Sequence, residues 1–459
     1  MPQQTPPNQP PADETLGSGV VAPTGIPQAT ELGVEGLVVA VGAEPTIHLR
    51  KRYLFAFIVA YFALYIAWIA PVAFSLAVRV EQLDAAGKNG AIALAIGVPS
   101  LVVLITGPLV GVLSDRTRLR LGRRRSWMLG GMIVGLLGSV AVGVATSVPL
   151  LIAAWTIAYV GYTAAGGMFL THLGDKLPEA QRGRVAGFSG AVTQIAPIFG
   201  VAIASAFTGL PVLMFAVPAV VAFLLGLIFI AVMKDTPAPS DIGRIDMRGL
   251  LQGYWFDPRR HPNFAWVWIS RCLIFIALSF STLYTVYLLG ERLQLDSATI
   301  GGLVATSGLL GLVVAIVGSV LSGTLSDRLR RRKPFIVVGG FLLAGGLVVT
   351  GTTTSVPQFF AGTLISVLGI GIFAAIDQAI GLDTLPSGEG QNGRFLGIFN
   401  LANQLAQGVG PFLAGAIVIA AGGDYMWVYL FAAAVAIIGG LLILRVQPGR
   451  PTTIERVPR

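Results

Sequence analysis

The chain reads Gly111-Val-Leu-Ser-Asp115-Arg116 after its second long apolar run and Gly323-Thr-Leu-Ser-Asp327-Arg328 after its eighth. The two copies of this G-x-L-S-D-R pattern lie 212 residues apart, and several arginines follow each copy. A second match follows the fourth and tenth runs, where Asp175-Lys-Leu-Pro178 pairs with Asp383-Thr-Leu-Pro386 at an offset of 208. Chance rarely produces two separate matches at nearly the same offset, so we interpret the chain as the product of an internal duplication.

The composition predicts a membrane protein. Of the 459 residues, 54% are hydrophobic and only 12% are charged, whereas soluble proteins carry about 25% charged residues. Apolar runs long enough to cross a bilayer, about 20 residues each, can be counted along the chain. We place twelve of them at about 53–78, 89–113, 127–146, 148–172, 185–206, 210–233, 263–289, 298–322, 335–354, 357–382, 395–420 and 425–444. The fold class expected is therefore all-α integral membrane, with two pseudo-symmetric bundles of six helices.

The positions of Lys and Arg predict the orientation. With twelve spans, 27 of the 31 basic residues fall on the side that holds both termini. The other side has Arg79, Lys88 and Arg292, and Arg271 lies inside a span. Since basic loops stay in the cytoplasm, both termini are expected there, in a multi-pass protein of the plasma membrane. The net charge of +9 is then explained by anionic lipid and requires no nucleic acid.

The expected organisation has five parts. A disordered cytoplasmic tail (1–48), rich in Pro and Gly, precedes the first six-helix bundle (49–233). A cytoplasmic central loop (234–262) leads to the second bundle (263–444), and a short cytoplasmic tail (445–459) ends the chain. The single Cys272 excludes an internal disulfide and a cysteine-built metal site. No metal and no cofactor is expected, and the absence of HExxH, GxSxG and Gly-Lys phosphate-loop motifs argues against an enzyme.

The repeated loop motif resembles that of the major facilitator superfamily. Within it, Gly107–Trp127 and Asp175–Arg184 are similar to the glycoside–pentoside–hexuronide cation symporters and the sucrose carriers, although Ser126 stands where those have Pro. The resemblance implies two bundles that rock around a midplane cavity lined by spans 1, 4, 7 and 10. Melibiose-type members carry acidic residues in spans 1, 2 and 4. This chain has none there, so a sodium site of that design is not expected.

The Asp-Arg loops are candidates for a cytoplasmic gate. A carboxylate beside arginines at a helix exit can form ion pairs, or lie against a helix N-terminus, while the cytoplasmic mouth is closed. The alternative is that the arginines only fix the topology. The gate candidates are Asp115, Arg116, Arg125, Asp327, Arg328 and Arg332.

Ionisable side chains inside spans are costly and usually functional. Arg271 in span 7 and Asp377 in span 10 are hypothesised to face the cavity and to form an ion pair that contacts substrate or proton. The alternative is a static pair that holds the two spans together. Gln378 follows Asp377 and points about 100° away from it on the helix.

Neutral polar residues complete the list of candidates. Asn400, Asn403 and Gln404 form a polar stripe on one face of span 11, and Gln194 is the repeat partner of Gln404. Such amides bind a ligand or join helices by hydrogen bonds. Aromatic residues with hydroxyl groups suit the stacking and bonding of a sugar ring, although membrane interfaces use them too. Those in spans 4 and 7 are Tyr159, Tyr162 and Tyr284.

Two functions stay open at this point. The first is a proton-coupled transporter of a sugar or glycoside that works as a monomer, with small-molecule substrate, protons and the lipid bilayer as its partners. The second is a multidrug or metabolite efflux antiporter of the same superfamily. A polytopic enzyme or a receptor, the third class considered, has no motif or large soluble domain to support it.

Overall fold

The computed structural model describes residues 50–177, 179–238, 256–385 and 392–447. Within these ranges every regular element is a helix. The helices of the first half are α1 (Lys51–Ala70), the π-helical turn η1 (Pro71–Ser75), α2 (Leu76–Leu83), α3 (Lys88–Asp115), α4 (Arg123–Val144), α5 (Val148–Lys176), α6 (Glu179–Ser205) and α7 (Pro211–Val232). The tails 1–48 and 448–459 and most of the predicted central loop lie outside the described residues.

The second half repeats this series. Its helices are α9 (Pro262–Leu293), α10 (Ser297–Leu329), α11 (Lys333–Gly351), α12 (Val356–Asp383), α13 (Asn392–Ala420), α14 (Met426–Leu442) and the 3-10 turn η2 (Ile443–Arg445). Twelve stretches of the described chain are long and apolar enough to cross a membrane, which confirms the predicted number of spans and the all-α class. Two of them extend further than predicted, because α3 ends within the G-x-L-S-D-R motif, at Asp115, and α10 ends just after it, at Leu329.

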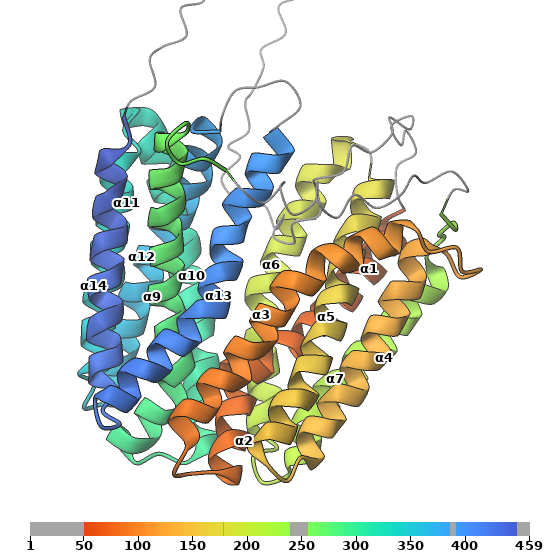
Figure 1. Cartoon of the computed structure of the whole chain (residues 1–459), viewed down its shortest axis with the longest axis horizontal. Coiled ribbons are helices and arrows are strands. Elements are labelled where there is room, and N and C mark those ends of the chain that lie inside the picture. Colours follow the sequence, from red (N-terminus) through yellow and green to blue (C-terminus); the bar gives the residue numbers. More distant parts are fainter. Residues whose placement is uncertain (1–49, 178, 239–255, 386–391, 448–459) are drawn as a thin grey trace, which may run out of the picture.

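The two halves stand side by side (Figure 1). The first half, drawn from red to yellow-green, lies on the right, and the second half, drawn from green to blue, lies on the left. We call the end of the bundle where α3 and α10 finish the arginine end, and the end where they begin the tyrosine end. In Figure 1 the arginine end is at the top, and the ribbons of the two halves approach each other most closely toward the tyrosine end.

Glycines allow the closest helix contacts, and they recur in both halves. A Cβ atom on Gly131 of α4 would lie 2.5 Å from the carbonyl oxygen of Gly161 on α5. A Cβ atom on Gly339 of α11 would likewise lie 2.9 Å from the carbonyl oxygen of Gly369 on α12. Each pair is related by an offset of 208 residues. Small residues at equivalent places thus let the same two helices of each half approach closely, as membrane bundles require.

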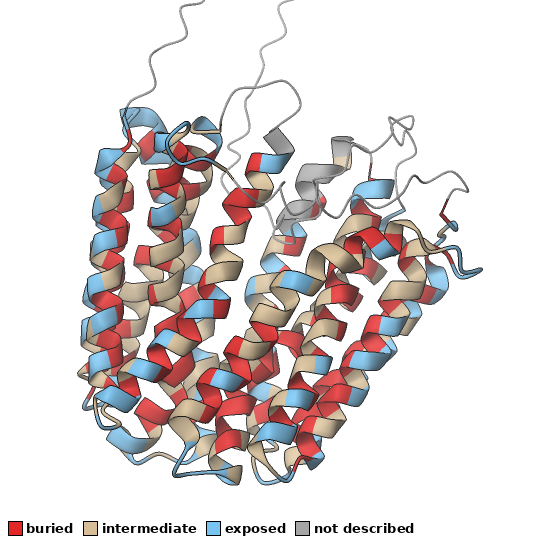
Figure 2. Ribbon diagram, viewed as in Figure 1, coloured by how far each residue is buried: buried red, intermediate tan, exposed pale blue. Residues whose placement is uncertain are grey.

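The outward faces of the helices are apolar. Large side chains such as Ile105, Leu137, Val313 and Ile419 are well exposed, although they lie within membrane spans. Figure 2 shows exposed positions in pale blue and buried positions in red alternating along the helices. Because apolar side chains can contact hydrocarbon directly, this pattern suits a bundle surrounded by lipid.

The first span is interrupted by a π-helical turn. Pro71 has no N–H group, so the bond that an α-helix would make from this residue is missing. The backbone N–H of Leu76 donates to the carbonyl oxygen of Pro71, five residues earlier. One extra residue is thereby accommodated in the turn, and α2 continues the span to Leu83.

Candidate functional site

The buried charges of the spans meet inside the second half. Arg271 of α9 and Asp377 of α12 form an ion pair, and each side chain is only 3% exposed. The guanidinium also lies over the rings of Phe399, with 4.2 Å from Cζ to the ring centre, and Phe275, at 5.0 Å. Aromatic faces attract a desolvated cation, so these rings help to hold Arg271 within the bundle. Arg271 and Asp377, which the sequence placed in spans 7 and 10, are thus in contact with each other.

The equivalent positions of the first half are aromatic. Tyr61 and Phe169 precede Arg271 and Asp377 by 210 and 208 residues, within the range of the repeat. Their ring centres lie 6.1 Å apart, and both side chains are fully buried. A ring contact therefore occupies the place that the ion pair occupies in the second half.

A continuous series of aromatic rings runs along α1 to α5. Neighbouring ring centres lie 4.8 Å apart for Tyr61 and Tyr65, 5.2 Å for Tyr65 and Trp68, and 5.9 Å for Trp68 and Tyr159. Tyr65 and Tyr159 are half-buried. We call these four residues the aromatic series. Sequence analysis identified only Tyr159, although the i, i+4 spacing of Tyr61 and Tyr65 is visible in the sequence.

Tyr162 and Tyr284 have other surroundings than predicted. The Tyr162 ring is buried against Gly135 of α4, and its hydroxyl lies 2.8 Å from Ser139 Oγ. The Tyr284 hydroxyl lies at the tyrosine end, where it donates to the carbonyl oxygen of Asn89. Neither residue belongs to the aromatic series. The Tyr162 ring packs against Gly135, which has no side chain, and Tyr284 lies near the end of α9.

The polar stripe of α13 varies in exposure. Asn400 is buried, Asn403 and Gln404 are half-buried, and Gln194 of α6 is exposed. The Oδ1 atom of Asn403 is buried and has no hydrogen-bond partner among the described residues. Gln378 is half-buried beside the ion pair. Since an unpaired buried amide oxygen is costly, Asn403 is the member of the stripe best suited to accept a bond from a ligand.

Three tyrosines join the two halves at the tyrosine end. The hydroxyl of Tyr284 donates to the Asn89 carbonyl oxygen at 2.7 Å, and that of Tyr425 donates to Asn89 Oδ1 at 2.8 Å. The hydroxyl of Tyr287 donates to the carbonyl oxygen of Ala77 on α2 at 2.9 Å. Each bond links the second half to the first, so this end of the bundle is closed by direct contact.

A lysine reinforces this closure. Lys88 Nζ lies 2.6 Å from Glu81 Oε1 in its own half and 3.1 Å from Glu291 Oε1 in the other half. The Tyr425 hydroxyl also donates to Glu291 Oε1, at 3.1 Å. Burial, and then the adjacent Glu291 carboxylate, raise the pKa of Tyr425, so its hydroxyl stays protonated and available as a donor. None of these partners was identified from sequence, because they are far apart in the chain.

The loop at the arginine end of the first half is held by Arg124. Its Nη2 atom lies 2.7 Å from Asp115 Oδ1, and its Nε lies 3.3 Å from Asp175 Oδ2. Arg123 pairs with the same Asp175 oxygen at 3.0 Å. Asp115, Arg116 and Arg125 were the gate candidates in this loop, and the partner of Asp115 is Arg124, which follows the turn at Gly122 and was not among them.

The backbone at the N-terminus of α4 is bonded by Asp235. This residue, after α7, accepts from the backbone N–H groups of Arg124 and Arg125 at 2.6 and 2.8 Å. Asp115, a sequence candidate for such a position, is the last residue of α3 and pairs with the side chain of Arg124 in the first turn of α4. In the second half, Arg332 pairs with Asp383 at 2.5 Å. Asp327 and Arg328 form no ion pair within the described chain. Each of these ion pairs between described residues lies within one half.

The sequence matches the family described as the Major Facilitator Superfamily over residues 53–390 and 293–459. Among the described residues, no group of three His, Cys, Asp or Glu side chains is placed to hold a metal ion. No curated protein matches the chain.

Several solved transporters share the fold. A bacterial homolog of the human lysosomal transporter Spinster, in an inward-facing and unoccupied conformation, has a TM-score of 0.68 at 14% identity, covering 88% of this chain and all of that one. The nucleoside transporter NupG has a TM-score of 0.67 at 14% identity, covering 86% and 100%. A POT family transporter in complex with a thioalcohol-conjugated peptide has a TM-score of 0.67 at 15% identity, covering 86% and 95%. At such identities the likeness concerns the fold alone.

Proposed function

Since the chain belongs to the Major Facilitator Superfamily, whose members are non-enzymatic carriers, we propose that it transports a sugar or glycoside together with protons. The two halves would expose a central binding site alternately to the two sides of the plasma membrane. A monomer suffices for this mechanism, because one chain carries both halves.

The distribution of charge supports placing the arginine end in the cytoplasm. Of the 31 basic residues, 27 belong to that side of the predicted topology. The contacts of Tyr284, Tyr287 and Tyr425 would then close the outer side of the transporter. On this orientation the conformation described is inward-facing.

The observation that carries the substrate class is the combination of rings and neutral amides within the spans. Tyr65 and Tyr159 present half-buried hydroxyl-bearing rings, and Asn403 has a buried oxygen to which no described residue donates. The charges of Arg271 and Asp377, by contrast, are directed to each other. An uncharged ring with several hydroxyl groups suits this set, since it can stack on a ring face and donate to an amide.

The proposed coupling site is the Arg271–Asp377 pair. A proton on Asp377 would neutralise the carboxylate and release Arg271 toward Phe275 or Phe399. Two arrangements of one buried pair would thereby distinguish the loaded from the empty transporter.

The test is uptake of a panel of radiolabelled sugars and glycosides into proteoliposomes, with and without an imposed pH gradient. We expect one class of sugar to accumulate when the interior is alkaline. The Y159F and N403A variants should raise KM about tenfold, whereas Y162F should alter stability and leave KM unchanged. Failure of every sugar in an active preparation would contradict the proposal.

The aromatic series favours a second candidate, an efflux antiporter for apolar drugs or metabolites. Four adjacent rings offer more apolar than polar surface. In that case inside-out vesicles with an acidic interior should accumulate apolar aromatic solutes in exchange for protons, and sugars should not compete. The same Y159F variant would then have little effect, because the ring would be retained.

A further inference from the structure

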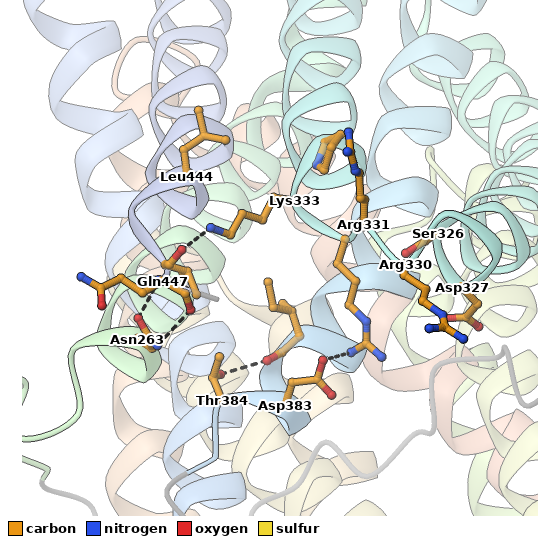
Figure 3. Close-up of a pocket in the computed structure, with 14 residues that line it drawn as sticks. Asn263, Ser326, Asp327, Arg330, Arg331, Lys333, Asp383, Thr384, Leu444 and Gln447 are labelled. Carbon is orange, nitrogen blue, oxygen red and sulfur yellow. Dashed lines mark hydrogen bonds and ion pairs between the residues drawn. The ribbon is translucent and has the colours of Figure 1, made fainter. Parts of the chain in front are cut away.

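A pocket of about 770 Å³ lies at the arginine end of the second half (Figure 3). It is lined by residues from the ends of α9, α10, α11, α12 and α14, and its volume is within the range of small-molecule sites. Figure 3 shows Ser326, Asp327 and Arg330 at one side of this pocket and Lys333 beside Gln447 at the other. The pocket is separate from the aromatic series and from the Arg271–Asp377 pair.

The corresponding place in the first half is filled by the chain itself. The guanidinium of Arg124, whose side chain is 5% exposed, donates to Ser114 Oγ at 3.2 Å and pairs with Asp115 and Asp175. Asp235 adds a carboxylate at the N-terminus of α4. The guanidinium and the three carboxylates therefore find their partners within this half.

The second half keeps the arginine, with fewer contacts among the described residues. Arg332 stands where the repeat places Arg124, at the offset of 208 residues that also relates Gly131 to Gly339, and it pairs with Asp383, the counterpart of Asp175. Gln447, which lies 212 residues after Asp235, is uncharged. Gln447 binds Asn263 through its backbone, and Lys333 Nζ donates to the carbonyl oxygen of Val446. Among the described residues, no side chain of the second half makes with Ser326 the contact that Arg124 makes with Ser114.

A buried hydroxyl in this pocket has no partner. Ser326, the repeat counterpart of Ser114, is 1% exposed, and its Oγ atom makes no hydrogen bond among the described residues. In the first half the same hydroxyl accepts from Arg124 and donates to the Arg123 carbonyl oxygen. Buried hydroxyl groups are normally paired, so Ser326 indicates a ligand that supplies a partner.

The charge of the pocket indicates the sign of the ligand's charge. Four basic side chains, those of Arg330, Arg331, Arg332 and Lys333, face two carboxylates, those of Asp327 and Asp383. Arg332 and Asp383 neutralise each other. Among the residues that line the pocket, Arg330, Arg331 and Lys333 then face Asp327 alone, which leaves a surplus of two positive charges.

We propose that this pocket binds a phosphate-bearing anion. Arg330 and Arg331 would contact the phosphate oxygens, Ser326 would donate its hydroxyl proton to one of them, and Lys333 would add its charge. The phosphate would belong either to the headgroup of an anionic phospholipid or to a free phosphate compound. The proposal does not depend on which solute the carrier moves.

The experiment measures binding of two probes to the purified full chain. One probe is phosphatidylglycerol, titrated into phosphatidylcholine nanodiscs, and the other is sodium phosphate. Retained lipid is counted by native mass spectrometry, and the thermal shift gives the affinity. The S326A variant and the R330Q/R331Q double variant are compared with R118Q/R120Q, which removes the same charge from the exposed loop of the first half.

We expect saturable binding that R330Q/R331Q weakens about tenfold and S326A weakens about threefold, while R118Q/R120Q retains the wild-type affinity. Binding of phosphatidylglycerol alone would identify a lipid headgroup, and competition by sodium phosphate would identify a free phosphate compound. Both results support the site. Equal weakening by R118Q/R120Q would overturn it, as would the absence of saturable binding to a wild-type chain that melts cooperatively.

Discussion

Charge is held at different depths in the two halves. In the first half Arg124 joins Asp115 and Asp175 at the arginine end, and the interior positions equivalent to the ion pair carry Tyr61 and Phe169. In the second half the interior carries Arg271 and Asp377, while Arg332 at the end is more exposed than Arg124 and pairs with Asp383. Two copies of one six-helix plan have thus kept their backbone contacts and exchanged the places where charge is buried.

This difference indicates that the residues of the loop motif and those of the bundle interior can change independently of each other. The glycine contacts of α4 with α5 and of α11 with α12 recur at one offset, because helix spacing cannot change without rebuilding the bundle. Side chains at the helix ends and in the interior have no such constraint. Substitution of one charged residue therefore probes one half alone. Matched substitutions in the two halves can separate effects on stability from effects on transport.

Breaking the interior pair is expected to have the largest effect. The R271Q or D377N single variants should each lower the free energy of unfolding by about 3 to 5 kcal/mol, because the partner charge stays buried and unpaired. The R271Q/D377N double variant should recover much of that loss. Chemical denaturation in detergent measures both. Equal stability of the single variants and the wild type would show that the charge is not isolated from water.

Full transport by the stable double variant would show that the pair is only structural. Loss of proton-driven uptake with retained exchange would instead support the proposed coupling role.

The loop arginines should differ between the halves. R124Q should cost about 2 kcal/mol, since it removes a 95% buried guanidinium from Ser114, Asp115 and Asp175. R332Q should cost less than about 1 kcal/mol, because Asp383 is more than half exposed and water can replace its partner. Melting of the two variants under one condition checks the order. An equal loss would mean that the second loop is as tightly held as the first.

Weakening the tyrosine-end closure should shift the conformational equilibrium. E291Q removes a contact between halves, whereas E81Q removes a contact of the same Lys88 within one half. We expect E291Q to raise the fraction of molecules that are open at this end roughly threefold. This corresponds to a free-energy change of under about 1 kcal/mol, because Glu291 is half exposed.

Spin labels on A86C and A421C, in a C272S background, report the distance across this end by double electron–electron resonance. A long-distance population that grows equally in E81Q and E291Q would contradict the assignment of Glu291 as the residue that links the halves.

The smallest effect is expected at the start of α10. Asp296 accepts from the backbone N–H groups of Ala298 and Thr299, whereas the equivalent start of α3 has Gly87 without a side-chain cap. Hydrogen bonds from the Thr299 hydroxyl and backbone lower the pKa of Asp296 in the folded chain. Its stabilising effect is therefore present above the ordinary aspartate pKa of about 3.9 and is lost as the pH falls below it.

The D296A variant should melt slightly below the wild type at neutral pH, and the difference should vanish in acid. Melting curves across that pH range provide the check. A difference that persists in acid would assign the effect to helix propensity in place of the cap.

Periodicity and repeats could predict the spans, the duplication and the two interior charges, because each depends on local composition. The identity of the arginine that binds Asp115 could not be predicted among the six in that loop. It depends on the turn at Gly122, whose φ of 103° directs the chain inward. The closure by Tyr425 and Asn89 was also beyond sequence reasoning, since these residues are 336 positions apart.

The site residues show the same limit. Tyr162 and Tyr159 are three residues apart on one helix, yet the first is sealed behind Gly135 and the second joins the aromatic series. Which face of α5 meets α4 follows from glycine positions in both helices. A single sequence gives hydroxyl-bearing rings in a span, but only the packing separates those that are available to a ligand.

The π-helical turn has a mechanical consequence for the first span. Pro71 leaves a missing bond at the point where α1, packed within its own half, passes into α2, which holds the Tyr287 hydroxyl of the other half. A rod with one weak joint bends there before it bends elsewhere. If the halves separate at the tyrosine end, α2 can follow its partner for part of the motion while α1 stays in place, so the first span works as a jointed lever rather than as a rigid post.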